Sequence, residues 1–200
     1  MLVAACARAS VYNETYTINT YIPNGNPVGV MFSENVSSAE LPAGSVISGL
    51  TVGLNISGGY NGGLVAYIVA PNGALVSLLN QPGISSSPFG YGGSGLNVML
   101  SDGSVNNIQS TSETPGSQFT GTYSAAGNLS GVDGSVADGN WTLFFANLSS
   151  GGANGELNSF TLNFTAVPEP VGMGLGIFAG LVGLWLCLRL CWKESSGPKT

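Results

Sequence analysis

The sequence predicts an all-β fold, an antiparallel β-sandwich or jelly roll, followed by one C-terminal transmembrane helix. Short alternations of apolar and polar residues recur between turn-rich segments across residues 11–166, and no helical periodicity interrupts them. The chain has 31 glycines, 10 prolines and only 7% charged residues, a composition that suits short strands joined by tight turns. Residues 171–188, in contrast, form an apolar run without a charge. We therefore expect a single β domain over residues 11–166.

The expected strands follow from a period of two, in which every second side chain faces the core. In the first strand, Tyr12, Tyr16, Ile18 and Ile22 alternate with mostly polar neighbours. A Pro-Asn-Gly turn at residues 71–73 predicts a β-hairpin between the two strands that flank it. The pattern indicates eight or nine strands, and the clearest cover residues 12–22, 50–56, 64–69, 75–79, 97–102, 141–145 and 160–164. Residues 81–95 and 103–117 are expected to be loops, with 103–117 the more mobile.

The C-terminal apolar run is long enough to cross a membrane. Its eighteen residues would extend roughly 27 Å as a helix, close to the thickness of the hydrocarbon layer. Basic residues mark the cytoplasmic side of a membrane span, and Arg189, Lys193 and Lys199 all follow the run. We expect a transmembrane helix over residues 171–192, a basic cytoplasmic tail over 193–200, and the β domain on the opposite side of the membrane.

The motif Val167, Pro168, Glu169 and Pro170 stands directly before the apolar run and the basic tail. Together the three features resemble the PEP-CTERM sorting signal of exported proteins in Gram-negative bacteria. The resemblance implies recognition by a membrane-embedded exosortase, cleavage near the motif, and delivery to the cell surface or the extracellular matrix. The alternative is a single-pass anchor that is never cut.

Residues 1–10 look like the remnant of a secretory signal peptide. Ala7-Arg8-Ala9 is a small-x-small cleavage pattern, although the basic start and the full apolar stretch of a signal peptide are missing. We expect the true start to lie upstream. The segment from Val3 to Cys6 also resembles a lipoprotein cleavage box, which leaves lipidation as an alternative.

A second set of segments, covering most of the β domain, comprises residues 22–24, 50–56, 60–64, 70–73, 139–143 and 155–164. In their order and spacing they resemble the P domain that follows the catalytic domain of kexin- and furin-like proprotein convertases. The resemblance implies a β-sandwich, while protease activity does not carry over because the catalytic domain is absent. The chain departs from the family at Gly63, Asn147 and Ala153, where acidic residues are usual, and at Phe160, where Trp is usual. The resemblance therefore gives little support to a calcium site of the family type.

Charge and composition exclude several classes of function. No Lys or Arg occurs between Ser10 and Ala166, while eight acidic residues do, so the domain repels phosphate backbones and nucleic acid is excluded as a partner. The chain contains no histidine, which excludes Ser-His-Asp and Cys-His catalysis and the commonest zinc ligand. Its three cysteines, at positions 6, 187 and 191, lie outside the domain, so no disulfide stabilises it.

The remaining candidate sites are carboxylates and aromatic rings in turn-rich segments. Asp102, Asp133 and Asp138 are candidate calcium ligands, but each precedes glycine and is also a typical turn residue. Asp102 with Glu113, or Asp133 with Asp138, would be needed for a carboxylate-based hydrolase. Tyr60 and Tyr91 are the candidate ligand-binding aromatics, in turn-rich stretches that also contain Phe89 and Tyr123; the alternative is that these rings pack within the domain.

The sequence therefore predicts a non-enzymatic exported surface or matrix protein with no catalytic residues and no cofactor, calcium excepted. Its expected partners are the exosortase, the membrane and an extracellular polysaccharide. The competing hypothesis is a carbohydrate-binding module, with or without calcium.

Overall fold

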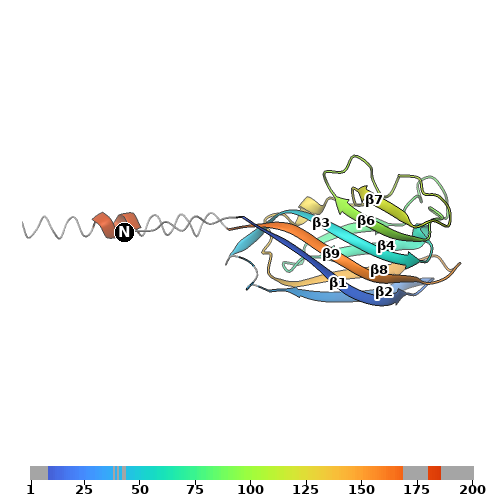
Figure 1. Cartoon of the computed structure of the whole chain (residues 1–200), viewed down its shortest axis with the longest axis horizontal. Coiled ribbons are helices and arrows are strands. Elements are labelled where there is room, and N and C mark those ends of the chain that lie inside the picture. The colour runs from blue at the N-terminus through green and yellow to red at the C-terminus, as the bar shows by residue number, and fades with distance from the viewer. Residues whose placement is uncertain (1–8, 38, 40, 42–43, 169–179, 186–200) are drawn as a thin grey trace, which may run out of the picture.

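The computed structural model describes residues 9–37, 39, 41, 44–168 and 180–185 (Figure 1). These residues form nine strands and two short 3-10 helices, together with a helical segment over residues 180–185. The 3-10 helices are η1 (Asn61–Gly63) and η2 (Leu129–Val132). The strands are β1 (Ser10–Ile22), β2 (Asn26–Val36), β3 (Ser45–Gly58), β4 (Leu64–Val69), β5 (Leu75–Asn80), β6 (Gly95–Ser101), β7 (Phe119–Tyr123), β8 (Gly139–Asn147) and β9 (Gly155–Pro168).

The strands form two sheets that face each other, which confirms the all-β sandwich. One sheet has the order β1-β9-β3-β6-β7 and the other β2-β8-β4-β5. Every paired neighbour is antiparallel except β6 and β7, which run parallel from Leu96 beside Phe119 to Leu100 beside Tyr123. The expectation of a wholly antiparallel sandwich is wrong at this pair. A parallel pair needs a long crossover, and the loop over residues 102–118 supplies it.

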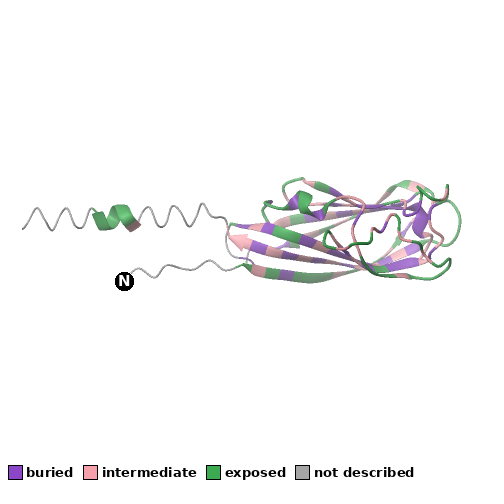
Figure 2. Cartoon of the chain, turned by 90° about the horizontal axis from the view of Figure 1, so that it is seen from above, coloured by how far each residue is buried: buried purple, intermediate pink, exposed green. Residues whose placement is uncertain are grey.

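The core lies between the sheets and is made by the residues whose alternation predicted the strands. Trp141, Phe145, Phe160 and Phe164 are all at most 1% exposed, and burial of each such side chain contributes roughly 1.5–3 kcal/mol. Trp141 stacks on Phe164, with 5.7 Å between the ring centroids, which joins strands of the two sheets. Figure 2 shows the same alternation of buried and exposed positions along the strands.

Two strands, β2 and β7, were not predicted. Both lie at the edge of a sheet. β2 buries only Val36 fully and leaves Val28 and Met31 more than 70% exposed, while β7 has no fully buried residue. Apolar residues do stand at alternate positions of β2, at Val30, Phe32 and Val36, but Met31 and Glu34 interrupt the pattern. β7 offers only Phe119 and Tyr123, so the period of two is weak in both edge strands.

The two ends of the sandwich differ in what they carry. β1 pairs with β9 so that Ser10 lies opposite Ala166, and Ile22 lies opposite Gly155. The first and last strands therefore enter and leave the domain at one end, which we call the terminal end. The opposite end carries the loops over residues 23–25, 59–63, 81–94 and 148–154, and we call it the loop end (Figure 1).

The C-terminal predictions fall mostly outside the described residues. Val167 and Pro168 complete β9 and pair with Val46 and Ser45, so the domain extends two residues beyond the predicted boundary. Of the expected span over residues 171–192, only residues 180–185 are described, and they are helical. Within the part of the chain that is described, no helix has the length and apolar character needed to span a membrane. Residues 1–8, Glu169, Pro170, Arg189, Lys193 and Lys199 also lie outside the described ranges.

Candidate functional site

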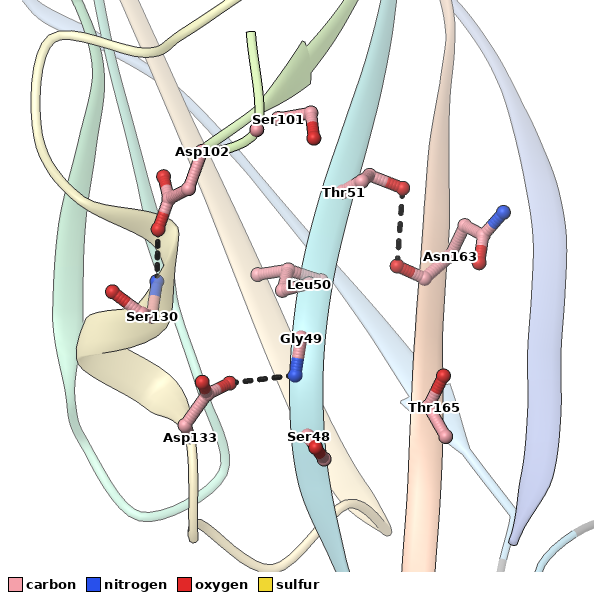
Figure 3. A pocket seen from close by; sticks show the side chains of 11 residues that line it. Ser48, Gly49, Leu50, Thr51, Ser101, Asp102, Ser130, Asp133, Asn163 and Thr165 are labelled. Atoms are coloured by element: carbon pink, nitrogen blue, oxygen red, sulfur yellow. Dashed lines mark hydrogen bonds between the residues drawn. The ribbon is translucent and has the colours of Figure 1, made fainter.

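Two of the three candidate calcium ligands line one groove on the outer face of the larger sheet (Figure 3). Asp102 follows β6 and Asp133 follows η2, and the groove between them has a volume of about 420 Å³. The other side chains around it are mostly short hydroxyl and amide groups, from Ser48, Thr51, Ser101, Ser130, Asn163 and Thr165. Asp138, the third candidate, immediately precedes β8 and does not line this groove.

Both carboxylates in the groove accept hydrogen bonds from the backbone. Asp102 Oδ1 accepts from the amide of Leu129 and Oδ2 from the amide of Ser130, both at 2.8 Å. These are amides of the first turn of η2, whose own N-cap residue makes no side-chain capping bond. Asp133 Oδ1 accepts from the Gly49 amide at 2.8 Å, which ties the end of η2 to β3. The arrangement supports a structural role in holding η2 against the sheet.

The structure does not bring together the carboxylate pairs predicted from sequence proximity, Asp102 with Glu113 and Asp133 with Asp138. Asp102 lies at the end of β6, whereas Glu113 contacts residues near the start of that strand, so the two do not share a site. Asp102 and Asp133 are brought to one groove instead. Among the described residues, no three side chains of the His, Cys, Asp or Glu type gather where they would hold a metal ion. Calcium binding stays a prediction.

A buried polar cluster, which sequence reasoning missed, lies at the loop end. Asn61 in η1 is fully buried; its Nδ2 donates to Gly95 O at 2.9 Å and to Glu113 Oε2 at 3.0 Å, while its Oδ1 accepts from Gly95 N at 2.9 Å. Burial raises the pKa of the Glu113 carboxyl, and hydrogen bonds from Asn61 and the Gly93 backbone lower it by less. In the sequence, Asn61 stands among turn residues, so nothing signals its burial.

The two candidate ligand-binding tyrosines pack into the loops. Tyr60 is half-buried, and its hydroxyl donates to Gly90 O at 3.5 Å. Tyr91 is also half-buried, and its ring occupies the space where a side chain at Gly83 would stand. Phe89, two residues before Tyr91 in the same loop, is 75% exposed. Of the three aromatic residues at positions 60, 89 and 91, Phe89 is therefore the one most accessible to a ligand.

Phe89 borders a hollow of about 390 Å³ at the loop end. Three segments line this hollow. They are Gly62 and Gly63 of η1, Pro88 and Phe89 of the 81–94 loop, and Leu148 to Gly151 of the loop after β8. A side chain at Gly63 would overlap the Asn147 amide and the Ser149 backbone. Asn147 is fully buried, and its Nδ2 donates to Asn24 Oδ1 at 2.9 Å. Two positions that depart from the P-domain pattern, 63 and 147, are thus direct neighbours.

No family model matches the chain, and no curated protein matches it. Among solved structures, its fold is similar to a chain in the crystal structure of the Aeromonas sobria serine protease (ASP) with the chaperone ORF2, with a TM-score of 0.51 and 10% identity. The match covers 81% of this chain and 28% of that one. A crystal structure of the serine protease of Aeromonas sobria matches with a TM-score of 0.46 and 11% identity, over 79% of this chain and 27% of that chain. The chain spans less than a third of the length of either matched chain. The similarity to the first structure is a similarity of fold alone.

Proposed function

We propose that this chain is a non-enzymatic exported protein of the cell surface or extracellular matrix, sorted and cleaved by an exosortase at Val167–Pro170. The observation that carries the proposal is the position of the motif relative to the fold. Val167 and Pro168 are the last residues of β9, paired with Val46 and Ser45, and the motif continues directly beyond them. Cleavage after the strand would release a sandwich that has already made all its β-sheet pairings.

The ends of the domain support the same proposal. Because Ser10 lies opposite Ala166, an export signal before β1 and a sorting signal after β9 would both extend from the terminal end. The loop end would then point away from the membrane while the precursor is still anchored. This leaves the loops over 59–63, 81–94 and 148–154 free to meet material outside the cell.

The chemistry of the domain favours a binding or structural role. The chain has no histidine to act as a general base, and the backbone amides of Leu129, Ser130 and Gly49 occupy oxygens of the Asp102 and Asp133 carboxylates. The resemblance to the convertase P domain, which accompanies a separate catalytic domain, supports a sandwich without catalytic residues of its own.

The test is the C-terminus of the mature protein. The full chain, with a complete export signal, is produced in a Gram-negative host that has an exosortase and in the same host with the exosortase gene deleted. We expect mass spectrometry to find a surface or secreted form ending near residues 167–170 in the first host, and the full-length chain in the inner membrane of the second.

Variants in the motif sharpen this test. Pro168→Ala and Pro170→Ala should leave uncleaved precursor in the membrane, whereas the control Pro115→Ala, an exposed loop proline, should be processed like the original chain. Full-length protein in the inner membrane of both hosts would show that the C-terminus is only an anchor.

A further inference from the structure

Phe89 is a large apolar side chain presented to solvent on a firmly held loop. The ring is 75% exposed, although the backbone beside it is closely packed: a side chain at Gly62 would overlap Phe89 O, and one at Gly90 would come within 2.6 Å of Gly62 Cα. The Gly62 amide donates to Tyr91 O at 2.8 Å, and the Tyr91 amide donates to Pro82 O at 2.8 Å. The loop therefore fixes the backbone that carries the ring before any ligand arrives, which lowers the entropy cost of ordering the loop on binding.

The opposite wall of the hollow is held in the same way. The Leu148 amide donates to Gly63 O at 2.8 Å, the Ser149 amide donates to Asn147 Oδ1 at 3.0 Å, and Ser149 O accepts from the Gly25 amide at 2.8 Å. Gly62 and Gly63 lie between the two walls, and the lack of side chains there lets the walls come close to η1. The hollow is thus built from three anchored segments.

The lining of the hollow points to one class of ligand. Phe89 and Leu148 supply apolar surface, Gln81, Ser149 and Ser150 supply amide and hydroxyl groups, and no charged residue lines it. Binding sites commonly combine an aromatic or apolar surface with a few polar groups that fix orientation. A sugar ring matches this pairing, because it has an apolar face of C–H groups and a rim of hydroxyls. The acidic character of the domain disfavours a negatively charged ligand.

We propose that the hollow bounded by Phe89 and Leu148 binds an uncharged polysaccharide, with the Phe89 ring stacked on a sugar face. Gln81 and the serines of the 148–151 loop hydrogen-bond the hydroxyls on the rim of the sugar. The proposal replaces the two tyrosines favoured by the sequence with Phe89. It rests on the surface role proposed above and names the class of ligand that such a protein would bind, but it does not require cleavage by an exosortase.

The experiment uses the full chain in detergent micelles and native gels that contain one polysaccharide each. The neutral probes are dextran, laminarin, xyloglucan and galactomannan, and alginate is the acidic probe. We expect at least one neutral polymer to retard the chain and alginate not to. Phe89→Ala should weaken that retardation about tenfold or more, because it removes the central contact. Phe89→Trp should retain it.

The matched control is Tyr21→Ala, which removes another exposed aromatic ring, from the edge strand β1, that does not line the hollow. It should bind like the original chain. The proposal is wrong if no neutral polymer retards the protein, if alginate retards it equally, or if Phe89→Ala and Tyr21→Ala behave alike. If the protein is cleaved and exported but no neutral polymer retards it, only the sugar site is refuted. If a neutral polymer retards the protein but the protein is never cleaved, only the sorting proposal is refuted.

Discussion

The fully buried amide of Asn61 donates to Glu113 Oε2 at 3.0 Å and joins the loop before β7 to the start of β4. Glu113 Oε1, beside it, is buried without a hydrogen-bond partner. One oxygen of the carboxylate is thus satisfied and the other is desolvated. This asymmetry explains why burial is the largest influence on the Glu113 pKa.

The first prediction concerns the pH dependence of stability. The folded-state pKa of Glu113 is raised, so its contribution to stability is fully present below the pKa of the unfolded chain and is lost as the pH rises through the folded value. Glu113→Gln stays neutral and keeps an oxygen to accept from Asn61. We expect the variant to melt at nearly the same temperature as the original chain near pH 4, and at a higher temperature at pH 7.5.

The measurement is the difference in melting temperature between the two proteins across this pH range. Taking the difference cancels groups that titrate equally in both. A difference that does not change with pH, or that favours the original chain at pH 7.5, would contradict the assignment of a desolvated carboxylate.

The second prediction concerns the close approach of Gly63 to the loop after β8. In Gly63→Ala, the new methyl group would overlap the Asn147 amide and come within 2.7 Å of the Ser149 amide nitrogen. Hydrogen bonds hold Asn147 to Asn24 and Ser149 to Gly25, so neither residue can move away easily. Overpacking of this kind should reduce the free energy of unfolding by about 1–3 kcal/mol. Urea denaturation followed by tryptophan fluorescence measures this loss.

Gly151→Ala is the control for the second prediction. A methyl group there would meet nothing within 4 Å, and we expect a change within about 0.5 kcal/mol. Equal effects of the two substitutions would show that the contact between position 63 and Asn147 is not tight.

The third prediction separates structural from metal-binding roles of the groove carboxylates. Asp102→Ala removes two hydrogen bonds to the first turn of η2 and should cost about 0.5–2 kcal/mol, as loss of a helix cap does. Asp138→Ala, outside the groove, should cost less than about 0.5 kcal/mol. Chemical denaturation of both variants gives the comparison.

Calcium provides a further readout in this experiment. If Asp102 and Asp133 only hold η2 against the sheet, millimolar calcium chloride and EDTA should give the original chain the same melting temperature. A rise with calcium that Asp102→Ala abolishes would assign a metal to the groove and contradict the structural role.

Much of the fold followed from local patterns, and much of the site did not. Strand β4 begins and ends at the predicted residues, and the apolar side chains whose alternation predicted β3, β8 and β9 are all buried in the core. Edge strands β2 and β7 were missed because they bury few side chains. Tyr60 and Tyr91 were chosen over Phe89 as ligand-binding aromatics because residue type and turn context do not show which ring of a loop reaches solvent.

The sequence by itself determined the absence of histidine, the one-sided acidic charge and the position of the C-terminal motif, because these are properties of composition and order. It also determined most of the strands, because a period of two needs only neighbouring residues. The tertiary structure decided which distant residues meet: Asp102 with Asp133 in one groove, Asn61 with Glu113, and Gly63 with Asn147. These contacts join segments 31 to 84 positions apart, and only the pairing and packing of the strands bring them together.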